Sequence, residues 1–119
     1  MDADVKKMEG DSCWTAAPDL AVAASKRVIL RDGGKTLLVE LDYREGRCTY
    51  AVRLTQKPGR TIEYSGEWQC SDGSRGQASC RLFPDGEDYF LFGSWSEGGT
   101  SYHWWSALSQ VDHFEDERP

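Results

Sequence analysis

The chain lacks the short motifs that identify most enzymes and metal proteins. Its cysteines stand neither in a CxxC pair nor in any other zinc-ligand spacing. The four cysteines are Cys13, Cys48, Cys70 and Cys80. The two histidines, His103 and His113, belong to no motif that joins them to carboxylates or thiols, and no serine lies in a nucleophile elbow. We therefore expect no catalytic residue, no metal site and no cofactor.

Long apolar runs and clusters of basic residues are missing as well. The apolar runs are only a few residues long, which excludes a membrane-spanning helix. The segment "MDADVKKMEGDSC" has no apolar signal core, so we expect a cytoplasmic protein with reduced thiols. The formal charge is −6 and the basic residues are scattered, so we expect no nucleic-acid partner and no membrane partner. A basic protein partner is compatible with this acidic charge.

The length of 119 residues predicts a single domain. We expect a flexible N-terminal arm over 1–17, the domain over 18–111 and a charged tail over 112–119. The segment "PDLAVAASK" (18–26) predicts a short helix. Pro18 suits the first helical turn, Asp19 suits the helix dipole, and alanines follow.

From Arg27 onward, apolar and polar residues alternate and turn signals recur, which is typical of antiparallel strands. A loop at Gly33-Gly34 pairs Leu30 with Leu37 and Val28 with Val39. A loop at Glu45-Gly46 sets Tyr43 opposite Cys48, Leu41 opposite Tyr50, Val39 opposite Val52 and Leu37 opposite Leu54. Every pair is apolar, so the alternation and the turns specify the same register.

Three later turns predict the remaining pairs. A three-residue loop or a bulge at "KPGR" sets Leu54 opposite Ile62. A loop at Asp85-Gly86 pairs Leu82 with Tyr89 and Cys80 with Leu91. A loop at Gly98-Gly99 pairs Trp95 with Tyr102 and Gly93 with Trp104. Cys70 and Cys80 flank the "SDGSRGQ" loop symmetrically, so we expect these two thiols to face each other across neighbouring strands.

The predicted fold is all-β, an antiparallel up-and-down meander of about seven strands. One face of such a sheet is strongly apolar and needs to be covered. The meander is therefore expected to close, or nearly close, into a small barrel.

The predicted register turns all five tyrosines and three of the five tryptophans toward the inside. Because a buried tyrosine hydroxyl needs a hydrogen-bond partner, this composition favours a ligand cup that is open at one end. The alternative is a filled core in which tyrosines near the mouth place their hydroxyls in water. The residues that we expect to line the cup are Tyr50, Tyr64, Trp68, Trp95, Tyr102 and Trp104.

The outside of the predicted sheet carries a second aromatic set, the outer patch, formed by Phe83, Phe90, Phe92 and Trp105. A patch of this size is unusual for an exposed surface. Either the helix at Leu20–Val22 or the arm with Trp14 covers it, or it is an interface where aromatic anchors concentrate. The sequence leaves both readings open.

Two segments share a strand pattern, "YSGEW" (64–68) and "LFGSW" (91–95). With the turn between them, these segments resemble MORN repeats, although their spacing is longer and no third copy follows. The Gly-x-Trp strand ends and the final "YHWWSAL" also look like the calycin group of avidins, lipocalins and fatty-acid-binding proteins. The calycin resemblance implies a small apolar or planar ligand in the barrel mouth.

Two functions follow from these patterns. The first is a non-enzymatic binding module whose aromatic cup holds a small hydrophobic or planar ligand. The second is a protein-interaction domain that uses the outer patch, either as an acidic inhibitor or immunity-type protein or as a homodimer.

Overall fold

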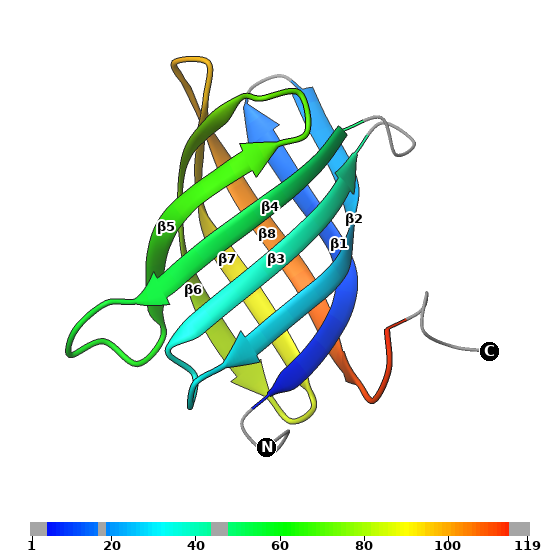
Figure 1. Cartoon of the computed structure of the whole chain (residues 1–119), viewed down its shortest axis with the longest axis vertical. Coiled ribbons are helices and arrows are strands. Elements are labelled where there is room, and N and C mark those ends of the chain that lie inside the picture. Colours follow the sequence, from blue (N-terminus) through cyan, green and yellow to red (C-terminus); the bar gives the residue numbers. More distant parts are fainter. Residues whose placement is uncertain (1–4, 17–18, 44–47, 115–119) are drawn as a thin grey trace.

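The computed structural model is a closed barrel of antiparallel strands in the order β1 to β8 (Figure 1). It describes residues 5–16, 19–43 and 48–114. Within these ranges, only the backbone of residues 16, 19–21, 43 and 48 is described. The strands in these ranges are β1 Lys6–Ala16, β2 Asp19–Arg31, β3 Thr36–Tyr43, β4 Cys48–Gln56, β5 Glu63–Cys70, β6 Arg75–Asp85, β7 Asp88–Glu97 and β8 Thr100–Val111.

Strand β1 closes the barrel because it pairs with β2 on one side and with β8 on the other. Across β1 and β8, Ser12 lies opposite Ser106, and Trp14 lies opposite Trp104. Among the eight described strands, closure leaves no unpaired sheet edge, which removes the template for aggregation that an open meander would present. The predicted all-β closed meander is confirmed, with one strand more than expected.

The predicted helix over residues 18–26 is wrong, since Asp19–Arg31 forms β2. Val22 and Ala24 are exposed whereas Ala23 and Ser25 are buried, which is the period-two alternation of a strand. Pairing with β1 and β3 outweighs the helix propensity of the alanines, because tertiary context commonly overrides intrinsic propensity.

The predicted flexible arm over 1–17 is replaced by a strand over Lys6–Ala16. Met8, Ser12 and Trp14 of this strand are buried inside the barrel. In the predicted tail over 112–119, Phe114 is also buried. Its ring lies 5.4 Å from Nζ of Lys7 and 5.1 Å from Cζ of Arg27. Residues 115–119 lie outside the described part of the chain.

Three predicted registers are confirmed. The pairs between β2 and β3, between β3 and β4, and between β7 and β8 are those that the turns predicted. The β2–β3 turn spans four residues instead of two, and Asp32, Gly33 and Gly34 all have positive φ. The pairing is nevertheless the same because the turn remains centred between Gly33 and Gly34.

Two predicted registers are wrong by an even number of residues. Leu54 lies opposite Gly66, not Ile62, and Leu82 lies opposite Leu91, not Tyr89. Correspondingly, Cys80 lies opposite Gly93. An even shift changes a residue's partner but keeps the face to which its side chain points, so the predicted inner and outer sets survive.

The predicted facing of Cys70 and Cys80 is also wrong. Cys80 lies opposite Tyr64, and Cys70 lies opposite Tyr50. The reason is the tight β5–β6 turn, in which the Cys70 N–H donates to the Ser74 carbonyl at 2.8 Å. Both cysteines are buried free thiols.

We name the two ends of the barrel by Figure 1, where the β5–β6 and β7–β8 turns lie at the upper end and the β2–β3 and β6–β7 turns at the lower end. The lower half is filled mainly by aliphatic side chains, which include Met8, Val28, Leu37, Leu54, Leu91 and Leu108. Two tyrosines tie this end together. The Tyr64 hydroxyl donates to the Gly34 carbonyl of the β2–β3 turn, and Lys6 Nζ donates to the Tyr89 hydroxyl at 2.9 Å.

The Cys80 thiol predicts a loss of stability at alkaline pH. Burial raises the pKa of this thiol from 9.0 to about 12. From about pH 9 to about pH 12 the unfolded chain therefore loses a proton that the folded chain keeps, so the free energy of unfolding falls as the pH rises. The Cys80 contribution to this slope approaches about 1.4 kcal/mol per pH unit.

Urea unfolding at a series of alkaline pH values measures this effect. We expect Cys80→Ala to have a shallower pH dependence than the wild type, because the substitution removes the titrating group. The control Leu82→Ala, which shortens a buried side chain of the same strand that has no titrating group, should keep the wild-type slope. Equal slopes for Cys80→Ala and the wild type would contradict the assignment.

Candidate functional site

Five rings fill the upper half of the barrel and form what we call the aromatic cluster. Its members are Trp14, Tyr50, Trp68, Trp95 and Trp104, from β1, β4, β5, β7 and β8. Each ring faces inward because it occupies the buried phase of its strand. The least buried member is Tyr50, with 8% of its surface exposed.

Trp95 is the centre of the aromatic cluster. Its ring stacks on Trp68 with centroids 5.1 Å apart and planes 11° apart. Trp14, Tyr50 and Trp104 meet Trp95 edge-on, with centroids 5.4, 5.4 and 5.3 Å away. Stacked and edge-to-face contacts at these distances are the favoured arrangements of aromatic pairs, so the cluster is tightly packed.

A carboxylate lies against the cluster at the upper end. Glu97 accepts hydrogen bonds from Trp95 Nε1 at 3.0 Å and from the Tyr50 hydroxyl at 3.3 Å. Glu97 is partly exposed and ends β7, directly before the Gly98-Gly99 turn. No described lysine, arginine or histidine forms an ion pair with it. The upper end of the barrel therefore carries a partly exposed carboxylate that accepts hydrogen bonds from two aromatic side chains.

Buried polar groups lie next to the aromatic cluster on the wall made by β1, β2 and β8. The Ser12 hydroxyl hydrogen-bonds to the hydroxyls of Ser25 and Ser106, and all three residues are buried. Trp104 Nε1 is buried and has no hydrogen-bond partner among the described residues. A buried donor without a partner lowers the free energy of unfolding by about 1–3 kcal/mol. The interior is therefore more polar than the stability of a core requires.

The structure brings most of the predicted cup residues together. Tyr50, Trp68, Trp95 and Trp104 belong to the cluster. Tyr102 lies opposite Trp95 in the strand register and is partly buried against the core. Tyr64 is different, because it lies at the lower end with its hydroxyl on Gly34. Burial raises the pKa of this hydroxyl.

Two functional candidates escaped the sequence analysis. Trp14 was assigned to the arm, although it contacts Trp95 inside the barrel. Glu97 is not among the predicted site residues, although it continues the inward alternation of Leu91, Gly93 and Trp95. That alternation was the available signal for Glu97. The side chain of Tyr43 lies outside the described part of the structure.

The outer patch is exposed on β6, β7 and β8. The exposed fractions are 37% for Phe83, 40% for Phe90 and 54% for Phe92, and Trp105 is partly exposed. Neither predicted cover exists in the described residues, because Leu20–Val22 is part of β2 and Trp14 points into the barrel.

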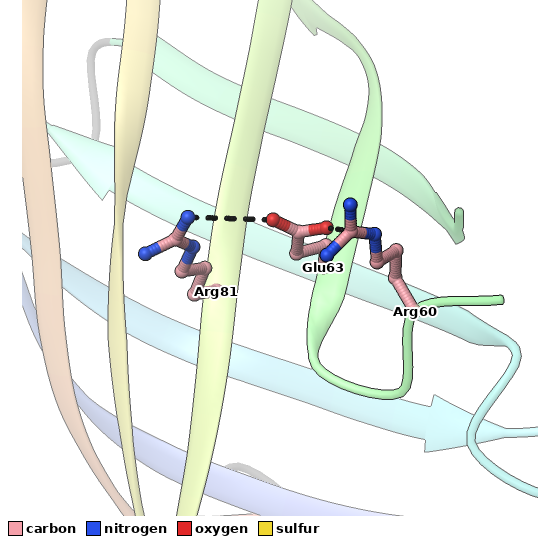
Figure 2. A network of polar contacts seen from close by, with 3 residues as sticks. All are labelled: Arg60, Glu63 and Arg81. Carbon is pink, nitrogen blue, oxygen red and sulfur yellow. Dashed lines mark hydrogen bonds and ion pairs between the residues drawn. The ribbon is translucent and has the colours of Figure 1, made fainter. Parts of the chain in front are cut away.

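A charged network lies beside the outer patch, since Arg81 of β6 lies opposite Phe92 of β7. Figure 2 shows the three residues of this network. Glu63, at the start of β5, binds Arg60 of the β4–β5 loop and Arg81 of β6, with N–O distances of 3.4 Å in both cases. Both arginine side chains are more than half exposed, so water screens these pairs and each contributes at most about 1 kcal/mol.

Within residues 5–16, 19–43 and 48–114, no group of three or more His, Cys, Asp or Glu side chains could hold a metal ion. His103 and His113 are both exposed. The same ranges contain no helix that is long and apolar enough to cross a membrane.

No protein-family model, curated protein or solved structure matches this chain. The closed meander is compatible with a calycin-like barrel, but no comparison assigns the chain to the calycins or to the MORN repeats. Because one fold serves many functions, the barrel alone does not specify what this chain does.

Proposed function

We propose that the chain is a non-enzymatic binding module that takes a small planar, largely apolar molecule at the upper mouth of its barrel. The observation that supports this proposal is the meeting of the aromatic cluster with the partly exposed Glu97 carboxylate at one end of a closed barrel. Ligand sites commonly combine aromatic walls with a few convergent polar groups. The free thiols of Cys13, Cys70 and Cys80 agree with a cytoplasmic location, which stays a prediction.

The packing of the cluster limits where the molecule sits. Rings around Trp95 are already in contact, so the ligand lies on the upper edge of the cluster rather than between its rings. That edge is formed by Tyr50, Tyr102 and Glu97. The lower end is tied together by Tyr64 and Tyr89, which leaves the upper mouth as the entry.

Each edge residue has a distinct part in this proposal. The Tyr102 ring supplies apolar contact area. The Glu97 carboxylate, fixed by Tyr50 and Trp95, accepts a hydrogen bond from an N–H or O–H group of the ligand and favours a positive charge on it.

Two planar dyes test the proposal, neutral Nile red and cationic proflavine, each titrated by fluorescence. We expect both to bind the wild type and Tyr102→Ala to weaken both by about tenfold, since an aromatic anchor is lost. Glu97→Gln should weaken proflavine more than Nile red, because only proflavine carries a positive charge and amino donors.

The matched control is Phe92→Ser, which removes an exposed ring from the outside of the barrel. It should leave both affinities unchanged. Circular dichroism of each variant confirms that the barrel is folded. The proposal fails if neither dye binds, or if Phe92→Ser abolishes binding while Tyr102→Ala does not.

A further inference from the structure

The outer patch forms one apolar surface across neighbouring strands, and no described residue covers Phe83, Phe90 or Phe92. Phe92 lies opposite Trp105 on β8, and Phe90 lies opposite Phe83 on β6. The rings of Phe83 and Phe92 pack edge-on with centroids 6.3 Å apart. Exposed rings in contact with one another, rather than scattered singly, mark an interaction surface.

The same surface continues beyond β8. Cys13 on β1 lies opposite Trp105 on one side and Val22 of β2 on the other, and Val22 is 52% exposed. A single row of outward side chains therefore runs from Val22 through Cys13 and Trp105 to Phe92.

Carboxylates border the outer patch toward the lower end. Asp88 precedes Phe90 by two residues on β7 and lies opposite Asp85 of β6. Asp11 of β1 lies opposite Ala107, which in turn lies opposite Phe90. All three carboxylates are exposed, and none is in an ion pair with a described residue. This border is therefore open to a cationic partner.

We propose that the outer patch docks a cationic amphipathic segment of another protein. Apolar side chains of the segment cover Phe90, Phe92 and Trp105, and its lysines or arginines meet Asp11, Asp85 and Asp88. Aromatic anchors within a charged rim are the usual anatomy of such interfaces. The complementary charges speed association and set the choice of partner.

A second copy of the chain fits this surface less well. Each copy carries a formal charge of −6 and the same acidic border, so two patches brought together would repel. The positive charge beside the patch, on Arg60 and Arg81, is already shared with Glu63 (Figure 2).

Fluorescence anisotropy with three labelled synthetic peptides tests the proposal. The first is a helical peptide of repeating Leu-Leu-Lys-Lys, the second has Glu in place of Lys, and the third is poly-lysine of the same length. We expect the Leu/Lys peptide to bind at least about tenfold more tightly than the others, because only it supplies both apolar anchors and positive charge. Its affinity should fall as salt is added.

Paired variants identify the surface. We expect Phe90→Ser with Phe92→Ser to abolish binding, and Asp85→Asn with Asp88→Asn to weaken binding and its salt dependence. The matched control is Glu40→Gln with Glu67→Gln on β3 and β5, which removes the same charge elsewhere and should change neither.

Several outcomes overturn the proposal. One is equal binding of the Leu/Lys and Leu/Glu peptides, or no binding of the Leu/Lys peptide. Another is unchanged binding in the phenylalanine variant. A third is a dimer in sedimentation that Phe92→Ser converts to a monomer, which would make the second copy the occupant. The dye experiments depend on Tyr102 and Glu97 at the upper end, where Phe92→Ser serves only as a control that should have no effect. Either proposal can therefore fail while the other stands.

Discussion

Replacing Trp95 with alanine is expected to lower the free energy of unfolding by about 4 kcal/mol, within the range of large-to-small core substitutions of aromatic residues. Trp95 contacts Trp14, Tyr50, Trp68 and Trp104, so its removal leaves four rings without their common neighbour. It also leaves Glu97 with one hydrogen-bond donor fewer. Urea unfolding followed by circular dichroism measures the change.

Trp105→Ala is the matched control for this prediction. Trp105 is the same residue type, lies on β8 and is partly exposed on the outside of the barrel. Its loss should cost about 1 kcal/mol or less, as is usual for substitutions away from the core. Equal losses in the free energy of unfolding for the two variants would contradict the difference in burial between Trp95 and Trp105.

Placing a side chain at Gly66 is expected to destabilise the barrel by about 3 kcal/mol, the upper end of overpacking costs. A Cβ atom at this position would lie 1.9 Å from the Arg53 carbonyl oxygen and 3.0 Å from Leu54 Cα. Both are backbone atoms of β4, so the two strands would have to separate. Thermal and urea unfolding of Gly66→Ala measure the cost.

Gly86→Ala is the control that separates the cost of steric crowding from the cost of an unfavourable backbone conformation. Gly86 lies in the β6–β7 turn with φ of 67°, and a Cβ atom there would meet nothing within 4 Å. Its substitution should cost only about 1–2 kcal/mol, the penalty for a left-handed residue with a side chain. If Gly66→Ala costs no more than Gly86→Ala, the close approach of β4 and β5 is wrong.

The fold was predictable from the sequence after residue 27 because side-chain alternation and turn residues agreed there. Leu30 with Leu37 and Trp95 with Tyr102 were found because their turns are short and centred as predicted. The pairings of Leu54 and Leu82 were not predicted correctly because the centres of the adjoining turns lie further along the chain than the turn residues indicate. Strand alternation still sent both residues inward.

The start of the chain was not predictable by the same rules. Lys6–Ala16 carries few β-branched residues, and it forms a strand because it pairs with β2 and β8. The sequence predicts a helix in the first part of β2, and β8 is distant in sequence. The loss of Trp14 from the predicted cup followed from this error. Strand alternation already placed Glu97 inward, but the hydrogen bonds from Tyr50 and Trp95 that explain a charged residue there are seen only in the structure.

We infer that strand alternation in the closed barrel separates an inner aromatic cluster from an outer patch with a different partner. The indole N–H signals of the five tryptophans in a two-dimensional NMR spectrum test this claim most directly. We predict that proflavine shifts the Trp95 signal and leaves Trp105 unchanged, whereas the Leu/Lys peptide shifts Trp105 and leaves Trp95 unchanged. Both probes shifting the same indole signal would contradict the claim.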